Sequence, residues 1–275
     1  MSEACSGNCS SCGRSDCGSR SQESLLAPAN AGSHVKKVIA VVSGKGGVGK
    51  STVTSLLASA MAKAGHSVGV LDADITGPSA PKAFGVTECR EAREEGIVPA
   101  LSEGGVQVMS INLLLDDETA PVLWRGPILG GAVKQFWTDV IWGDVDYLFV
   151  DMPPGTGDVP LTVFQSLPID GVVVVTTPQD LVSMIVAKAV NMARMMHVPV
   201  LGFVENYSYF ECPDCGKRVE VFGKSHLDAL AAEYGVPILA RLPIQAEVAA
   251  LVDQGRIEEA DVPALAGAAA AVERL

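Results

Sequence analysis

The chain has 275 residues, 48% of them hydrophobic, and a formal net charge of −12. This length and hydrophobic fraction predict a packed core large enough for one sizeable domain. Basic residues are scattered without a Lys/Arg run, so we expect neither nucleic-acid binding nor attraction to an anionic membrane. No apolar run reaches the ~18 residues that cross a bilayer, and the N-terminus has no apolar signal stretch, so the expected location is the cytoplasm.

Residues 1–33 differ in composition from the rest of the chain. They are rich in Ser, Gly and Asn and contain four of the seven cysteines, namely Cys5, Cys9, Cys12 and Cys17. Because this segment lacks apolar periodicity, we predict a flexible tail that becomes ordered only when something binds it. In a chain without an export signal, clustered cysteines indicate metal ligation or redox chemistry and not a disulfide framework.

From residue 34 onward, strand and helix patterns alternate. Val38–Val42 and Val68–Leu71 are continuous apolar runs, typical of strands that are buried on both faces, and a helix is predicted between them from about residue 51 to 64. Further strands are predicted at residues 106–111, 147–150, 171–176, 200–204 and 236–240, and further helices at 128–141, 181–196, 225–234, 245–253 and 263–275. The alternation predicts one α/β domain over residues 34–275, with a doubly wound, mostly parallel sheet and helices on both faces.

A glycine-rich loop lies between the first strand and the first helix. It matches the phosphate-binding pattern G-x-x-x-x-G-K-[ST] through Gly44, Lys45, Gly46, Gly47, Val48, Gly49, Lys50 and Ser51. Glycines let backbone N–H groups surround phosphates, and the helix N-terminus adds partial positive charge. We expect Lys50 to reach the β- and γ-phosphates, Ser51 to join a Mg²⁺ shell and Thr52 to touch the α-phosphate of bound ATP.

Acidic residues follow two of the predicted strands. Asp72 and Asp74 come after the second strand, and Asp151 comes after the strand at 147–150. In a parallel sheet the carboxyl ends of the strands converge on the ligand crevice, so these carboxylates should lie near the glycine-rich loop. Asp151 is predicted to hold Mg²⁺ through its water shell and Asp74 to orient the attacking water, whereas Asp72 fits a helix cap better. Residues 151–158, with two Pro and two Gly, are predicted to be a γ-phosphate-sensing switch loop.

A second cysteine motif, Cys212-Pro-Asp-Cys215-Gly216, lies late in the chain. The spacing lets both thiolates bind one metal or cluster, and Gly216 permits the tight turn. A redox dithiol, a zinc knuckle and an iron–sulfur site all remain open, although a zinc ribbon needs a second pair about 15–20 residues away. Two missing ligands could come from the same loop of a partner subunit, which suits a [4Fe–4S] cluster on a two-fold axis.

Residues 36–256 resemble the Mrp/ApbC family of iron–sulfur cluster carrier ATPases, within the deviant Walker A class of P-loop NTPases. The strings that carry the resemblance are Ser43–Ser51, Asp72–Ser79, Trp124–Pro127, Asp151–Asp158, and Val204–Phe210 with Cys212 and Cys215. The resemblance implies ATP hydrolysis, a homodimer, and a bridging [4Fe–4S] cluster at Cys212 and Cys215 that is passed to apo-proteins. We expect the hydrolysis to be slow, because the nucleotide acts as a switch and not as a bulk substrate. It also implies that Lys45 reaches the partner's ATP like an arginine finger, and that Asn206 recognises the adenine base.

Three possibilities stay open beside this one. The cysteines of residues 1–33 could wrap a second [4Fe–4S] cluster or hold no ligand. A partition or positioning ATPase would share the loop and Lys45, but it predicts a Lys/Arg-rich C-terminal helix, and residues 258–275 contain Arg274 as their only basic residue. A zinc-stabilised ATPase regulator differs from the carrier in its metal alone.

Overall fold

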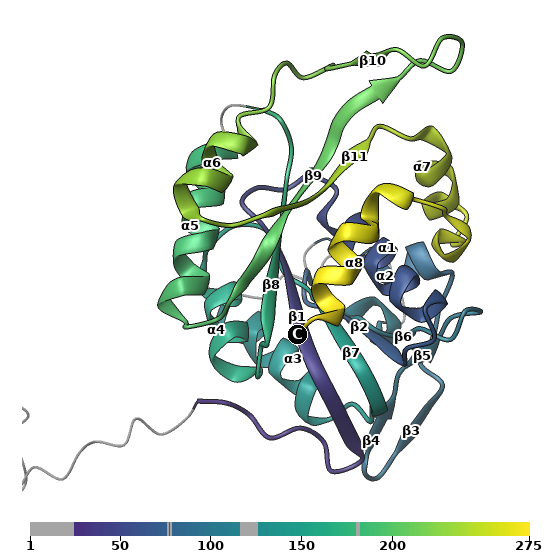
Figure 1. Cartoon of the computed structure of the whole chain (residues 1–275). Helices are drawn as coiled ribbons and strands as arrows, with labels where there is room; N and C mark the ends of the chain where they lie inside the picture. The colour runs from purple at the N-terminus through teal and green to yellow at the C-terminus, as the bar shows by residue number, and fades with distance from the viewer. Residues whose placement is uncertain (1–24, 76, 78, 116–125, 180–181) are drawn as a thin grey trace, which may run out of the picture.

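The computed structural model describes residues 25–75, 77, 79–115, 126–179 and 182–275. A nine-stranded sheet forms the centre, in the order β10-β9-β8-β1-β7-β2-β6-β5, with β11 pairing with β9 (Figure 1). Its strands are β1 (Ser33–Ser43), β2 (Val68–Asp72), β5 (Ala100–Leu101), β6 (Gln107–Met109), β7 (Gly143–Asp151), β8 (Gly171–Thr176), β9 (Val200–Glu211), β10 (Arg218–Val219) and β11 (Ile238–Pro243). A separate hairpin consists of β3 (Glu91–Arg93) and β4 (Gly96–Val98).

The sheet is mostly parallel, as predicted. In the described part of the chain, β5 and β10 are the members of this sheet that pair antiparallel, with β6 and β9 respectively. The helices are α1 (Lys50–Lys63), α2 (Ala80–Phe84), α3 (Gly126–Thr138), α4 (Asp158–Ser166), α5 (Val182–Met195), α6 (Leu227–Tyr234), α7 (Ala246–Asp253) and α8 (Ala266–Glu273). The helix predicted at 263–275 begins instead as a 3₁₀ turn at Pro263–Leu265.

Two apolar layers cover the two faces of the sheet. All six residues of β8 are buried, and this burial on both faces explains why the strand contains a run of valines. Successive strand side chains point to opposite faces, so Val172 and Val174 pack in one layer and Val173 and Val175 in the other. The first layer is completed by side chains of α3 to α6, and the second by side chains of α1, α2 and α8 (Figure 1). The doubly wound fold is confirmed.

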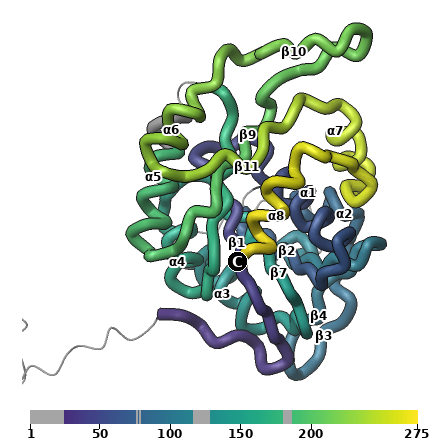
Figure 2. The backbone as a smooth tube through the Cα atoms, viewed as in Figure 1, coloured from purple at the N-terminus to yellow at the C-terminus, as the bar shows by residue number. Residues whose placement is uncertain are grey.

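The chain is already packed on the domain before β1 begins. The backbone N–H of Ala27 donates to the carbonyl of Ser166 (2.8 Å), and the buried indole N–H of Trp137 donates to the carbonyl of Ala27 (3.0 Å). The packed part of the chain therefore starts before the boundary that we predict at residue 33. In Figure 2 this segment runs below the sheet, away from the end of the molecule that carries β10.

The carboxyl ends of the parallel strands form one edge of the molecule. The glycine-rich loop follows β1, Asp72 ends β2 and Asp151 ends β7. The strand β9 extends beyond this edge and turns back through β10, so the two strands form a protruding hairpin (Figure 1). No helix in the described residues is long and apolar enough to cross a membrane.

Candidate functional site

The glycine-rich loop adopts the backbone shape that the motif predicts. Gly47 and Gly49 have φ angles of 80° and 76°, in the left-handed region that favours glycine. The helix α1 begins directly afterwards at Lys50, so its first N–H groups point toward the loop. This arrangement of backbone N–H groups at a helix N-terminus is suited to bind phosphates.

Asp151 stands at the centre of a buried polar cluster beside the loop. Its carboxylate accepts hydrogen bonds from Lys50 Nζ (2.6 Å), Ser51 Oγ (2.5 Å) and Thr54 Oγ1 (2.8 Å). The side chains of Lys50 and Asp151 are only 5% and 1% exposed, so each compensates the charge of the other. The structure thus brings together three residues that the sequence predicts for one site. Oxygen donors such as Ser51 and Asp151 are also the kind that Mg²⁺ prefers, so this group fits that ion.

Asp72 has the capping role that we predict for it. Its carboxylate accepts hydrogen bonds from the N–H groups of Ser79 (3.0 Å) and Ala80 (3.1 Å), at the start of α2. It is fully buried and lies opposite Asp151 in the register of β2 and β7. Burial, reinforced by the charge of Asp151, raises the pKa of Asp72 to about 7, against the opposing effects of these N–H groups and Lys50.

Asp74 and Lys45 lie at the same edge of the sheet. Asp74 is half-buried in the loop after β2, and its N–H donates to Asp72 Oδ1 (3.2 Å). The ammonium group of Lys45 donates to Gln179 Oε1 (2.5 Å), on the segment after β8. The roles of Asp74 toward water and of Lys45 toward a partner subunit stay predictions.

The predicted switch loop is attached to the end of β1. The N–H of Met152 donates to the carbonyl of Val41 (3.1 Å), and that of Gly155 donates to the carbonyl of Ser43 (2.9 Å). The last residue of the segment, Asp158, is already the first residue of α4. Residues 151–158 therefore connect the end of β1, next to the glycine-rich loop, to the start of α4.

Asn206 lies inside β9 and not at the end of a strand. The strand that we predict to stop near residue 204 runs on to Glu211, because β10 and β11 pair with its extension. The amide Nδ2 of Asn206 donates to the carbonyl of Val48 in the glycine-rich loop (3.0 Å). A cavity of about 190 Å³ beside it is lined by residues of α1, β9, β11 and α7, including Thr52, Leu56, Tyr207, Pro243 and Val248. Its position next to the loop makes it the candidate pocket for a nucleotide base.

The cysteine pair lies at the tip of the β9–β10 hairpin. Cys212 is half-buried, Cys215 is exposed, and both are free thiols. The turn is closed by hydrogen bonds from the Cys212 N–H to the Lys217 carbonyl (3.0 Å) and from the Gly216 N–H to the Cys212 carbonyl (2.9 Å). Gly216 has a φ of 66°, as the tight turn requires.

The environment of Cys212 favours its thiolate. Backbone N–H groups of Asp214 and Cys215, followed by the Cys215 side chain, lower the pKa of Cys212. Thiolates are the ligands that zinc and iron–sulfur clusters take from cysteine. Within the described residues, no group of three or more His, Cys, Asp or Glu side chains could hold a metal ion. The described part of one chain therefore offers two neighbouring thiols, half of the four ligands that a structural zinc ion or a [4Fe–4S] cluster takes.

The remaining predicted ligands lie elsewhere. Cys5, Cys9, Cys12 and Cys17 lie outside the described residues, as do the first two residues of the Trp124–Pro127 string. Cys89 is half-buried, and its Sγ lies 3.8 Å from the sulfur of Met109, which fits a packing role.

Comparison with known proteins decides the family. The family described as ParA, NUBPL iron-transfer P-loop NTPase, matches residues 34–274. The chain belongs to this family. Its resemblance to the iron–sulfur cluster carriers is confirmed, since the iron-sulfur cluster carrier protein of Clostridium perfringens is 47% identical over 92% of this chain and 94% of its own length. The protein of the same name from Methanocaldococcus jannaschii is 45% identical over 91% of this chain and 89% of its own.

Solved structures agree with this assignment to the iron-transfer P-loop NTPases. A nucleotide-binding protein from Archaeoglobus fulgidus, in complex with ADP, is 44% identical, with a TM-score of 0.75 over 84% of this chain and 90% of that chain. The cell division ATPase MinD of Pyrococcus furiosus has a TM-score of 0.63 over 86% of this chain and 98% of its own, but at 20% identity it shows the fold alone. The family description names nucleotide hydrolysis and iron transfer, and the chain has a candidate site for each.

Proposed function

We propose that this chain is an ATP-dependent iron–sulfur cluster carrier that binds a [4Fe–4S] cluster and transfers it to apo-proteins. The observation that carries the proposal is the Cys212–Cys215 turn, whose N–H groups favour the thiolate of Cys212. The turn lies at the tip of a hairpin that extends from the edge of the sheet where the glycine-rich loop lies. The names of the relatives support the same cargo. In this reading the cluster is the substrate that the protein carries.

The nucleotide is ATP, bound with Mg²⁺. Gly44 to Ser51 surround the phosphates, Ser51 and Asp151 hold the ion, and Thr52 and Asn206 lie along the rest of the nucleotide. The ion, when bound, neutralises charge on the phosphates. Lys50 contributes a second positive charge there, while Asp74 orients the water that attacks the γ-phosphate.

The working unit is a homodimer. Two copies of the Cys212–Cys215 pair supply the four thiolates of one bridging cluster, and Lys45 of each copy reaches the other copy's ATP. Closing on ATP and opening after hydrolysis change the distance between the two pairs, and residues 151–158 transmit the change. Hydrolysis is slow, because the nucleotide acts as a switch.

Two further features belong to the proposal. The part of the predicted tail that precedes the packed segment around Ala27 contains Cys5, Cys9, Cys12 and Cys17, and these cysteines hold a second cluster. The protein works in the cytoplasm, and its partners are apo iron–sulfur proteins and not nucleic acid or membrane. The acidic charge of −12 is consistent with this choice of partners.

The test is the iron, acid-labile sulfide and zinc content of protein purified without oxygen. Wild type is compared with Cys212→Ser/Cys215→Ser, and Cys89→Ser serves as the matched control because its thiol packs inside the domain. We expect iron and sulfide in the wild type and in the control, and a reduced content in the double variant. Iron that remains in the double variant would be assigned to the tail.

Stoichiometric zinc without iron after cluster reconstitution would overturn the carrier function. It would leave a zinc-stabilised ATPase in its place. A partition-type activity is disfavoured because α8 (Ala266–Glu273) has no basic residue, whereas a membrane-binding helix of that kind is rich in Lys and Arg.

A further inference from the structure

The strand β9 connects the nucleotide site to the cysteine hairpin through a buried carboxylate. Glu205 is 1% exposed and lies between Thr176 of β8 and Arg241 of β11. It does not contact the Lys50–Asp151 cluster through any described hydrogen bond. Burying a charge is costly unless it is paired and hydrogen-bonded, so the partners of Glu205 matter.

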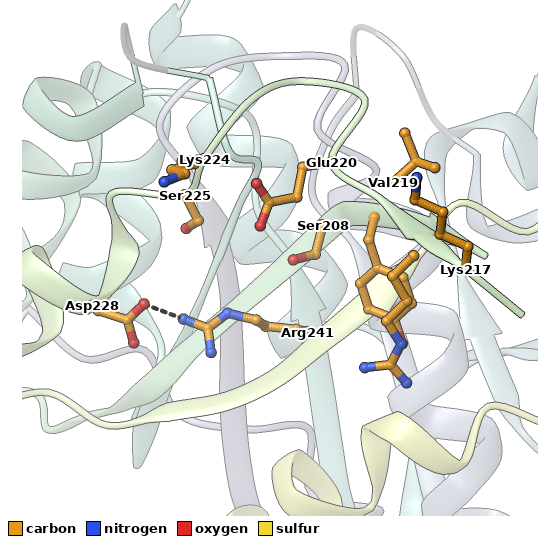
Figure 3. A pocket seen from close by; sticks show the side chains of 10 residues that line it. Ser208, Lys217, Val219, Glu220, Lys224, Ser225, Asp228 and Arg241 are labelled. Atoms are coloured by element: carbon orange, nitrogen blue, oxygen red, sulfur yellow. Dashed lines mark hydrogen bonds and ion pairs between the residues drawn. The ribbon is translucent and has the colours of Figure 1, made fainter.

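Glu205 ties together three segments of the chain. Its carboxylate accepts hydrogen bonds from the hydroxyls of Ser208 (2.6 Å) and Ser225, and Arg241 Nε lies 3.4 Å from Oε2. Ser208 is in β9 at the base of the hairpin, whereas Ser225 is on the segment that returns from the hairpin to α6. Arg241 is also bonded to Asp228 of α6 (2.7 Å), as Figure 3 shows. One buried side chain thus holds both ends of the hairpin.

The residue after Glu205 is in tight contact with the phosphate loop. Asn206 Nδ2 donates to the Val48 carbonyl, and a Cβ added to Gly49 would lie 2.2 Å from the same Nδ2 and 3.0 Å from Tyr207 Oη. Tyr207 itself has a φ of 55°, which is rare for a residue other than glycine. No free space separates the loop from β9 here, so a movement of the loop must displace residues 206–207.

The hairpin, in contrast, is held by few contacts. A groove of about 770 Å³ lies between it and the body, lined mainly by polar side chains that include Ser208, Glu220, Ser225 and Arg241 (Figure 3). On the hairpin itself, the Arg218 guanidinium lies 4.4 Å from the ring centre of Tyr209. A segment with little apolar packing has low local stability, so its position depends on the polar bonds at its base.

We propose that Glu205 is a positioning residue that couples nucleotide binding to the geometry of the Cys212–Cys215 turn. Phosphates that bind the glycine-rich loop move Val48 and Gly49 against Asn206. The displacement of β9 alters the bonds from Glu205 to Ser208 and Ser225, and the hairpin shifts with them. The inference rests on the proposed function only in taking Cys212 and Cys215 as the cargo site, because the coupling itself is a property of the chain without a cluster.

The test is the alkylation rate of Cys212 in the metal-free full-length protein, measured with iodoacetamide and peptide-resolved mass spectrometry. The rate reports the thiolate fraction and access of Cys212, which the N–H groups of the turn control. It is measured with and without a non-hydrolysable ATP analogue and Mg²⁺. In the wild type we expect the analogue to change the rate about 5-fold or more, the size of a typical coupling between two sites.

Two variants separate coupling from mere structure. Glu205→Gln keeps the shape of the side chain but removes its charge, and we expect the ratio of the two rates to fall to nearly one while nucleotide affinity is retained. Glu211→Gln is the matched control, because Glu211 is on the same strand and pairs with Arg218 at the surface (3.2 Å). That control should keep the wild-type ratio. If Glu205→Gln does not fold, Ser225→Ala, which removes one of the hydroxyl partners, should lower the ratio instead.

The proposal is overturned if the wild-type rate does not respond to a nucleotide that binds. It is also overturned if Glu205→Gln, or Ser225→Ala in its place, keeps the wild-type ratio, even when both rates change, since that result means a structural role alone. The proposal is overturned, too, if the ratio of the two alkylation rates falls to nearly one in Glu211→Gln as well as in Glu205→Gln, since the effect would then not be specific to Glu205. Because no cluster is present in these measurements, their failure is distinct from an absence of iron in the purified protein.

Discussion

Replacing Asp72 by Asn should change how the stability of the protein depends on pH. The carboxyl group is fully buried, faces Asp151 across β2 and β7, and has its pKa raised from 3.8 to about 7. The folded protein therefore holds a proton at Asp72 over a range of pH in which the unfolded chain has lost it. In the wild type, this stabilises the fold most below the unfolded pKa, and the stabilisation is lost as the pH rises through the folded pKa.

The size of the effect follows from the two pKa values. Between pH 5.5 and pH 8, a shift from 3.8 to about 7 lowers the free energy of unfolding of the wild type by about 2 kcal/mol. The amide introduced by Asp72→Asn does not titrate, so this part of the pH dependence is absent from the variant. Its oxygen can still accept a hydrogen bond from the start of α2, and any constant penalty of the replacement cancels in the comparison between the two pH values.

The assay is urea unfolding of nucleotide-free and metal-free protein at several pH values above the sequence pI of about 4.7. The difference in unfolding free energy between Asp72→Asn and wild type should move in favour of the variant by about 2 kcal/mol from pH 5.5 to 8. Asp74→Asn removes one negative charge two residues after Asp72 and reports how the loss of a nearby charge changes the pH dependence. A difference that stays constant with pH, or one equal to that of the Asp74 control, would refute the reasoning.

Three other predictions concern the loop, the dimer and the N-terminal segment. Gly49→Ala places a methyl group on a left-handed backbone and against side chains of β9. We expect the strain to raise the free energy of the binding-competent loop by at least about 1–2 kcal/mol. This should weaken ATP binding about 5–30-fold in a fluorescence titration. Gly46→Ala, where a Cβ meets nothing within 4 Å, is the control and should bind more tightly than Gly49→Ala; equal affinities would contradict the steric argument. Lys45→Ala should lower steady-state ATP hydrolysis by about 10³-fold with little change in ATP affinity, and unchanged hydrolysis would exclude a role in trans. Trp137→Phe loses the buried hydrogen bond to the Ala27 carbonyl and should lower the unfolding free energy by about 1 kcal/mol in urea, whereas an unchanged midpoint would mean that this anchor contributes nothing.

The long apolar elements of the fold could be predicted from the sequence, and the short ones could not. Strands such as β8 are buried on both faces, and the resulting run of valines is a strong signal. The strands β3 and β4 have three residues each, the first exposed and the second half-buried, and β10 has two residues, so none of them is long enough to show an apolar period. The helix α4 begins at Asp158, inside a segment whose Pro and Gly content indicates a loop. Its apolar residues pack on α3, which is information that the local sequence does not contain.

The candidate site was predictable where one motif specifies it. Lys50, Ser51 and Asp151 meet as expected, because the motif and the parallel order of the strands determine their places. Thr54 was missed, although it lies one helical turn after Lys50 and so on the same side of α1. The burial of Glu205 could not be predicted, since only the pairing of β9 with its neighbours shows that this carboxylate is buried. Contacts of that kind depend on long-range packing, which a local pattern does not encode.

The same N–H groups that lower the pKa of Cys212, and so favour a thiolate able to bind metal, also make it vulnerable to oxidation. A cysteine with a lowered pKa is more often a thiolate, which attacks peroxide to give a sulfenic acid and hydroxide, and the sulfenic acid then condenses with a nearby thiol to a disulfide and water. Cys215 is exposed and three positions away, so it is placed to be that second thiol. In the proposed carrier, cluster loading and oxidation therefore compete for the same two sulfur atoms. If Cys212 and Cys215 hold the cluster as proposed, the empty hairpin requires a reducing environment each time the cluster has been transferred.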